Sequence, residues 1–141
     1  MRSFIEYQEE GIVKTVSPDF SRAKSLIDES IKRKTFLEEL EHKIKLTDLN
    51  ANYFVEQCYD ILIELIRAKM LKQGFRSSGQ GAHEAEVSYL QILKFKEADI
   101  NFMNTLRYFR NGIKYYGKSL NKEYAEKVIS FMKRMYSELR T

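Results

Sequence analysis

Proline, glycine and cysteine are scarce in this sequence of 141 residues, which has one proline, six glycines, one cysteine and no tryptophan. An all-β sandwich of this length needs a turn signal about every 8–12 residues, and so few prolines and glycines do not supply them. A single cysteine, Cys58, excludes an internal disulfide and a thiolate metal cluster. The commonest residues are instead Glu, Lys and Leu, which favour helices, as do the Ala and Met that are also present. The sequence therefore predicts an all-α protein.

Long apolar runs and leader-like segments are also missing. The first residues, MRSFIEYQEE, lack the basic region and the apolar core of a secretory signal. The longest apolar stretch, Ile61–Ile66, is interrupted by Glu64, whereas a membrane-spanning helix needs about 18 or more apolar residues. We therefore expect a cytoplasmic protein that has no membrane partner.

The length suits one domain, because single cores are commonest at about 100–150 residues. The hydrophobic fraction is 43%, and nine Phe and nine Tyr make the expected core an aromatic one. No period of 20–50 residues repeats along the chain. We expect a single domain over residues 1–141, in which residues 1–16 form an irregular or briefly helical segment.

Hydrophobic periodicity and capping residues divide the rest of the chain into five helices. Ser17 followed by Pro18 is typical of a helix start, and Gly74 and Gly117 suit the left-handed residue that ends a helix. Residues 72–81, KQGFRSSGQG, form the one obvious loop. Short connections favour antiparallel neighbours, so the expected fold is an up-and-down antiparallel helical bundle of about five helices. They cover residues 17–41, 47–73, 82–94, 97–116 and 121–139.

Positive charge is concentrated in the second half of the chain. Residues 1–70 carry 11 Lys or Arg and 13 Asp or Glu, whereas residues 71–141 carry 13 and 7. A solvated surface explains this asymmetry, and so does a surface for an acidic partner such as nucleic acid. The composition leaves both interpretations open.

The helix expected over residues 97–116 has a basic edge with interleaved tyrosines. Its cations recur at steps of three and four, a spacing that places side chains along one edge of a helix. The cations are Arg107, Arg110, Lys114 and Lys118, and the tyrosines are Tyr108, Tyr115 and Tyr116. Cations that neutralise phosphates, beside aromatic rings that stack on bases, are typical of a surface for single-stranded RNA. A solvated basic edge with tyrosines reaching out of the core has the same pattern.

The Arg110-Asn111 pair lies in an otherwise apolar and aromatic part of this helix. Unpaired burial of such groups is costly, so the pair indicates either a structural polar network or a cluster that binds a phosphate. The pattern resembles the HEPN superfamily, whose helical-bundle members carry an Arg-Asn pair followed by His four to six positions after the Arg. Two further segments, GIVKTVSPDFSRAKSLIDESIKR and GFRSSGQGAHEAEVSYL, resemble HEPN proteins encoded beside minimal nucleotidyltransferases. The resemblance covers nearly the whole chain.

The histidine that acts with the arginine in active family members is missing. Lys114, Tyr115 and Tyr116 occupy the positions where it is expected, and no histidine follows Arg110. A tyrosine does not replace imidazole as a proton shuttle near neutral pH, because its ordinary pKa is about 10 against about 6.5 for histidine. The departure argues against ribonuclease activity but leaves nucleotide or RNA binding by Arg110 in place.

Two histidines remain elsewhere in the chain. His83 stands beside Glu84 at the start of an expected helix, where it is either a general base or a packing or capping residue. His42 lies among charged residues and is expected on the surface. Two histidines so far apart make no metal site, and we expect no cofactor. In related toxin-like family members the partner transferase modifies a tyrosine shortly after the motif. The corresponding position in this sequence is Gly117, so the resemblance does not itself predict modification of the neighbouring Tyr116.

The resemblance and the basic edge together give the expected function. It is that of a HEPN-family partner of a minimal nucleotidyltransferase, in a toxin–antitoxin-like pair, that forms a homodimer and binds nucleotide, RNA or the partner. The expected binding residues are Arg107, Arg110, Asn111, Lys114, Tyr116 and Lys118. Two alternatives stay open. One is a metal-independent endoribonuclease toxin with Arg110 and Asn111 as its catalytic pair. In it Arg110 holds the scissile phosphate, and Tyr115, Tyr116 or His83 replaces the missing histidine. The other is a non-catalytic structural dimer whose cations point only into solvent.

Overall fold

A computed structural model describes the backbone of residues 1–141 and the side chains of residues 1–113 and 117–141. Six helices and one pair of short strands make up the fold, which confirms the predicted all-α bundle. In chain order the elements are α1 (Phe4–Glu9), β1 (Val13–Thr15), α2 (Phe20–Lys43), α3 (Ala51–Lys72), β2 (Phe75–Ser77), α4 (Ala82–Ile92), α5 (Glu97–Tyr116) and α6 (Lys122–Leu139).

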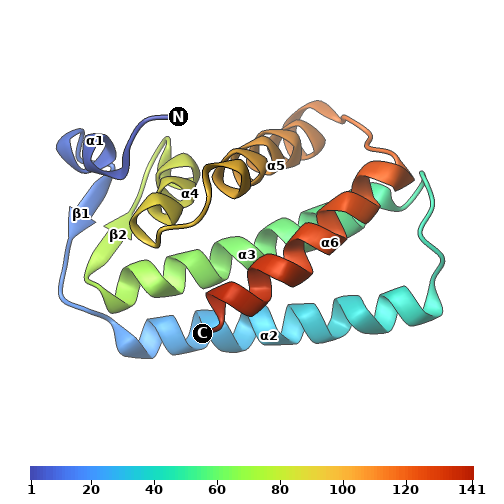
Figure 1. Cartoon of the computed structure of the whole chain (residues 1–141), viewed down its shortest axis with the longest axis horizontal. Helices are drawn as coiled ribbons and strands as arrows, with labels where there is room; N and C mark the ends of the chain where they lie inside the picture. Colours follow the sequence, from blue (N-terminus) through green and yellow to red (C-terminus); the bar gives the residue numbers. More distant parts are fainter.

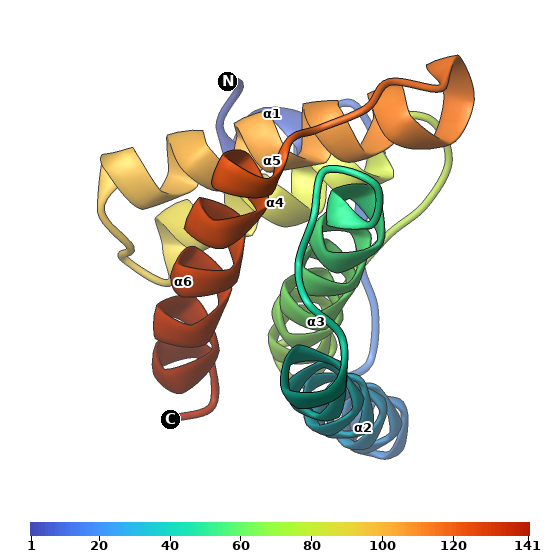
Figure 2. The same cartoon turned by 90° about the vertical axis from the view of Figure 1, so that its right-hand side faces the viewer.

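The helices lie in three layers, with α3 and α6 in the middle one (Figure 1). The long helix α2 covers one side of α3, and α1, α4 and α5 lie across the opposite side (Figure 2). α3 is the shared element of the fold, because it contacts α2, α4, α5 and α6. Polar side chains on α3 can therefore pair with residues of the layers on both of its sides.

Pairs of neighbouring helices differ in their relative direction. Helices that follow each other through short connections, α2 with α3 and α5 with α6, are antiparallel, as predicted (Figure 1). α3 and α6 are not adjacent in the sequence and run parallel. At one end of this pair the Asn52 side-chain oxygen accepts a hydrogen bond from Leu120 N at 2.7 Å, and at the other Lys69 Nζ donates to the carbonyl of Thr141 at 3.2 Å.

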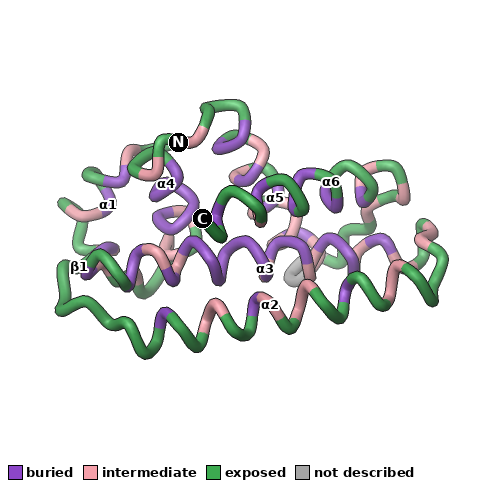
Figure 3. Tube along the Cα trace, turned by 60° about the horizontal axis from the view of Figure 1, so that its bottom comes forward, coloured by how far each residue is buried: buried purple, intermediate pink, exposed green. Residues whose placement is uncertain are grey.

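The core is built around α3, of which 14 of the 22 residues are buried (Figure 3). Each fully buried aliphatic or aromatic side chain contributes about 1.5–3 kcal/mol of transfer free energy, and this helix supplies more of them than any other. Cys58 lies in this core as predicted, and its burial raises the pKa of the thiol. His42 is exposed, as predicted. No helix among the described residues is long and apolar enough to cross a membrane.

The two strands are a departure from the prediction. Residues 72–81, expected as a loop, contain β2, which pairs antiparallel with β1 so that Val13 lies opposite Ser77. Gly74 makes the pairing possible, because it has a φ of +80° and a Cβ there would lie 2.6 Å from the carbonyl oxygen of Val16. Pairing between segments about 60 residues apart in the chain has no local sequence signal, so periodicity did not reveal it.

Helix ends were predicted with mixed success. α5 has the predicted bounds, and Gly117 ends it with a φ of 64° in the left-handed region. α2 is capped by Asp19, whose carboxylate accepts from Arg22 N at 2.9 Å, and not by Ser17. α3 begins after Asn50 rather than at residues 47–48, and α4 ends at Ile92 rather than at residue 94.

Candidate functional site

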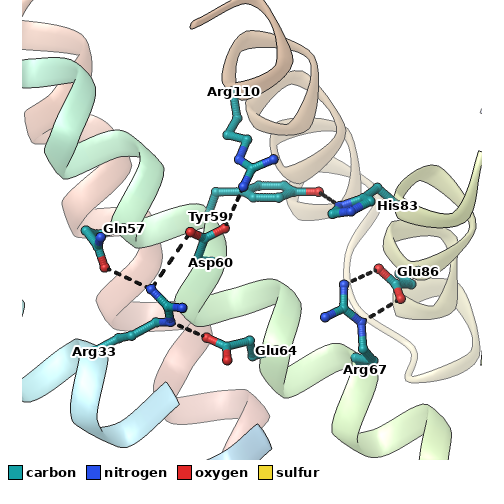
Figure 4. A network of polar contacts seen from close by, with 9 residues as sticks. All are labelled: Arg33, Gln57, Tyr59, Asp60, Glu64, Arg67, His83, Glu86 and Arg110. Carbon is teal, nitrogen blue, oxygen red and sulfur yellow. Dashed lines mark hydrogen bonds and ion pairs between the residues drawn. The ribbon is translucent and has the colours of Figure 1, made fainter. Parts of the chain in front are cut away.

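A stripe of charged residues follows one side of α3 through the interior of the bundle (Figure 4). Asp60, Glu64 and Arg67 are spaced four and three residues apart, so they share one side of the helix. Each is paired with a residue from another helix. Arg33 of α2 lies 2.7 Å from Glu64 and 4.0 Å from Asp60. The stripe thus links α3 to the layers on both of its sides.

Arg110 of α5 is the cation that sequence analysis singled out, and it points inward to this stripe. Its Nη2 donates to Asp60 Oδ1 at 3.2 Å, and its guanidinium carbon lies 5.4 Å from the centre of the Tyr59 ring. Only 16% of its side chain is exposed. An arginine in contact with both a carboxylate and an aromatic face is held in position. Arg110 therefore does not point only into solvent, as a purely structural dimer would have required.

His83 lies on the other side of Tyr59, at the start of α4. The Tyr59 hydroxyl is 3.1 Å from Nδ1 of His83, and the two rings are nearly parallel with centroids 6.1 Å apart. Burial raises the pKa of Tyr59, so the phenol keeps its proton. The hydroxyl donates to Nδ1 when the ring proton is on Nε2 and accepts from Nδ1–H in the other tautomer. The structure thus brings His83 and Arg110 to one tyrosine, although no sequence pattern connects them.

Burial of the ring lowers the pKa of His83, with Glu86 opposing the shift and Arg67 and Arg110 adding to it. The neutral form therefore predominates near neutral pH. A neutral imidazole can accept a proton on its unprotonated ring nitrogen and can donate a hydrogen bond to an anion from the protonated one. These are properties of a general base or of a ligand-binding group.

Arg67 and Glu86 form the most completely paired part of the network. Nε and Nη2 of Arg67 donate to the two carboxylate oxygens of Glu86 at 2.7 and 2.9 Å, and Ser77 Oγ donates to Oε2 at 2.7 Å. The Glu86 side chain is only 4% exposed. A bidentate pair of this kind has a fixed geometry, so it anchors α4 and β2 to α3.

The outer edge of α5 carries the other predicted residues. Arg107 is half-buried and donates from Nε to Asn104 Oδ1 at 3.0 Å. Tyr108 is 59% exposed, and Lys118 Nζ lies 5.3 Å from the centre of its ring. Asn111 is half-buried. This part of the edge therefore pairs a cation with an exposed aromatic face, as the RNA-surface interpretation requires.

Three predicted residues lie outside the described side chains. They are Lys114, Tyr115 and Tyr116. Among the described residues, no three His, Cys, Asp or Glu side chains lie together in a way that could hold a metal ion.

Sequence analysis missed Tyr59 and Asp60, which connect Arg110 to the rest of the network. A usable signal was present, because the carboxylates at residues 60 and 64 lie, at helical spacing, in the helix that contains the longest apolar stretch of the chain. Charges in such a helix need partners, which are Arg33 from the first half of the chain and Arg110 from the second half. The identity of each partner depends on how the layers stack, which no local pattern encodes.

The chain was also compared with known proteins. No family model, curated protein or solved structure matches it.

Proposed function

We propose that this protein is a HEPN-family RNA- or nucleotide-binding partner of a minimal nucleotidyltransferase, with α5 as its binding edge. The family assignment rests on the Arg110-Asn111 pair and the two flanking segments that resemble HEPN proteins. The binding edge consists of Arg107, Tyr108, Arg110 and Lys118.

The observation that carries this proposal is the pairing of Tyr108 with Lys118. A tyrosine that is 59% exposed, with an ammonium 5.3 Å from its ring, offers a stacking face beside a cation. Proteins that bind single-stranded nucleic acid combine these two features, because every base has a π-face and every nucleotide has a phosphate. Arg107, the residue before Tyr108 in α5, adds a second cation.

Arg110 contributes in a different way. Asp60 already neutralises it, so a phosphate that approaches Arg110 must compete with this carboxylate. Arg110 acts mainly by holding Tyr59 and α5 in place, and its direct contribution to RNA affinity is limited by Asp60. Asp60→Asn removes the competing charge and is expected to tighten RNA binding, a gain that misfolding does not produce.

The test is binding of a fluorescent single-stranded RNA, measured by anisotropy over a range of salt concentrations. Tyr108→Ala is expected to cost about 1–3 kcal/mol of binding free energy, the range for a lost stacking contact. Lys118→Ala is expected to lower the slope of log affinity against log salt by about 0.7.

Tyr53, which is 70% exposed on α3, provides the matched control. Tyr53→Ala removes an exposed tyrosine from another part of the molecule and is expected to leave RNA affinity unchanged. If Tyr108→Ala and Tyr53→Ala have equal effects, α5 is not the binding edge.

The partner and the homodimer belong to the same proposal and need their own tests. If the gene beside this one encodes a minimal nucleotidyltransferase, co-expression is expected to yield a complex that co-purifies. The dimer, which we place along α5, is measured by light scattering after gel filtration, where a monomer at all concentrations would contradict it.

A second candidate, a metal-independent endoribonuclease, is favoured by the position of His83. A neutral histidine contacts the same tyrosine as Arg110, so a proton acceptor and a phosphate-binding cation are close together without a histidine on α5. Incubation with total RNA in EDTA tests this function. Cleavage by the wild type that is lost in both His83→Ala and Arg110→Ala would support an endoribonuclease. Intact RNA would argue against this candidate and favour the RNA-binding function.

A further inference from the structure

A small cavity lies at the end of the molecule where α2 begins and α3 ends. Its volume is about 210 Å³, and its wall is made by α2, α3, β2 and α4. The charged and polar side chains in the wall are Arg22, Arg67, Arg76, Ser77, His83 and Glu86. These residues come from four separate elements, and only His83 was singled out by sequence analysis.

The cavity has an excess of positive charge. Three arginines face a single carboxylate, which leaves a balance of two positive charges. Glu86 is already bound by Arg67 and Ser77. Arg22 and Arg76 are exposed, and neither has an acidic partner at ion-pair distance within the part of the chain whose side chains are described. Two guanidinium groups are therefore free to bind an anion.

The remaining donors in the wall are held in fixed positions. Arg67 uses Nε and Nη2 on Glu86, which leaves its Nη1 group for a ligand. His83 uses Nδ1 in its hydrogen bond with the Tyr59 hydroxyl, which leaves Nε2 for a ligand. The first turn of α4, an 11-residue helix, adds partial positive charge on the same side. Guanidinium forks suit phosphate oxygens, which they bind in pairs.

Size and charge together select the ligand. A volume of about 210 Å³ is below the range of about 300–1,000 Å³ that encloses a drug-sized molecule, so the cavity holds a small anion or one end of a larger one. A phosphomonoester carries a charge of about −1.5 to −2 near neutral pH, whereas an internal phosphodiester of RNA carries one negative charge. The balance of two positive charges matches the phosphomonoester.

We propose that this cavity binds the terminal phosphomonoester of an RNA strand or nucleotide whose remaining part lies along α5. This inference rests on the proposed function and deepens it. Tyr59 connects the two regions, since its hydroxyl contacts His83 in the cavity wall and its ring contacts Arg110 of α5. Internal phosphates and bases are bound at α5, and the phosphorylated end is bound at the cavity.

The test compares three RNAs of one sequence, with a 5′-phosphate, a 3′-phosphate or hydroxyls at both ends, by anisotropy with an internal label. The wild type is expected to bind one of the phosphorylated RNAs about tenfold more tightly than the hydroxyl-ended RNA, because charge-assisted hydrogen bonds are added at the end. Arg22→Ala/Arg76→Ala is expected to lose this preference while its affinity for the hydroxyl-ended RNA changes about threefold or less. Both arginines are exposed, so the fold tolerates their replacement.

The matched control is Lys24→Ala/Lys32→Ala, which removes two exposed cations from α2 that do not line the cavity. This variant is expected to retain the preference for the phosphorylated end. Equal affinity of the wild type for all three RNAs would overturn the inference, and so would a preference that survives in Arg22→Ala/Arg76→Ala. Neither result affects the RNA-binding function of α5.

If no RNA binds, the proposed function fails and the cavity is tested alone. AMP and inorganic phosphate are titrated into the wild type and into Arg22→Ala/Arg76→Ala, with the His83 ring resonances observed by NMR. Saturable shifts with AMP in the wild type only would support a phosphomonoester site for free nucleotides. No shift with either ligand, or tight binding of a phosphoserine peptide in place of AMP, would overturn the inference.

Discussion

Removal of Arg67 tests whether the paired network holds the bundle together. Arg67→Met keeps most of the apolar length of the side chain but removes both donors to Glu86. The Glu86 carboxylate, which is 4% exposed, then keeps only the hydrogen bond from Ser77. A buried charge without its partner is among the most destabilising changes known in protein interiors.

The expected loss of unfolding free energy follows from this geometry. Breaking a buried pair costs about 3–5 kcal/mol, and the Arg67 side chain is 32% exposed, so water can reach part of the vacated position. The lower limit, about 3 kcal/mol, is therefore expected. For a domain of this size it lowers the melting temperature by about 6–12 °C. Arg67→Met/Glu86→Gln replaces the charge with an amide and is expected to recover about 2 kcal/mol of the loss.

The assay is urea unfolding followed by far-UV circular dichroism. Lys24→Met, which breaks an exposed pair with Asp28 on α2, is the control and is expected to change stability by about 0.5 kcal/mol or less. The reasoning is refuted if Arg67→Met costs less than about 1 kcal/mol, or if the double variant is as unstable as the single one. Either result would mean that Glu86 is solvated without Arg67.

Three further predictions follow from single positions. Gly74→Ala is expected to destabilise the protein by at least about 1 kcal/mol more than Gly79→Ala, because both glycines have positive φ but only at residue 74 would a Cβ collide, with the Val16 carbonyl; equal losses in thermal unfolding would contradict this. The pKa of His83 is lowered in the fold, so the unfolded chain takes up this proton first as pH falls, and wild-type stability decreases below about pH 6.5. His83→Gln is expected to lack that part of the pH dependence, and parallel stability curves for wild type and variant would argue against it. Because burial raises the pKa of the Cys58 thiol, a thiol reagent is expected to label native protein only as fast as the protein opens; rapid labelling of native protein would show that the site is accessible.

The elements that could be predicted are those whose determinants are local. α5 was located from its apolar period and from Gly117, a residue that tolerates the left-handed conformation at the helix end. The start of α2 shows the limit of this approach. Asp19 N donates to the carbonyl of Leu71 at 3.0 Å, and this contact with α3 favours Asp19 over Ser17 as the cap. A distant residue thus determines which of two suitable side chains begins the helix.

The candidate site was predictable only in part, for the same reason. Arg110 was identified as an unusual polar residue in an apolar helix, and burial of its side chain to 16% exposure agrees with that reasoning. The residues that connect it to the network were not identified. Asp60 is 50 residues away along the chain, and His83, which contacts the same tyrosine as Arg110, belongs to another helix. Residue types and helical spacing indicate that a buried charge needs a partner, but the way in which the helix layers stack determines which partner it has.

The carboxylates of α3 and α4 determine where positive charge remains available to a ligand. α5 has the basic edge that sequence analysis selected. Asp60 nevertheless neutralises Arg110, the cation of this edge that belongs to the Arg-Asn pair. Arg22 and Arg76 lie in the two segments that resemble HEPN proteins but were not singled out as binding residues. They are exposed beside a cavity in which the only carboxylate is already paired with Arg67. An anion with two negative charges is therefore expected to gain more from Arg22 and Arg76 than from Arg110. Loss of the first two should weaken binding of a phosphorylated end more than Arg110→Ala does, even though Arg110 is the residue that the sequence resemblance indicates.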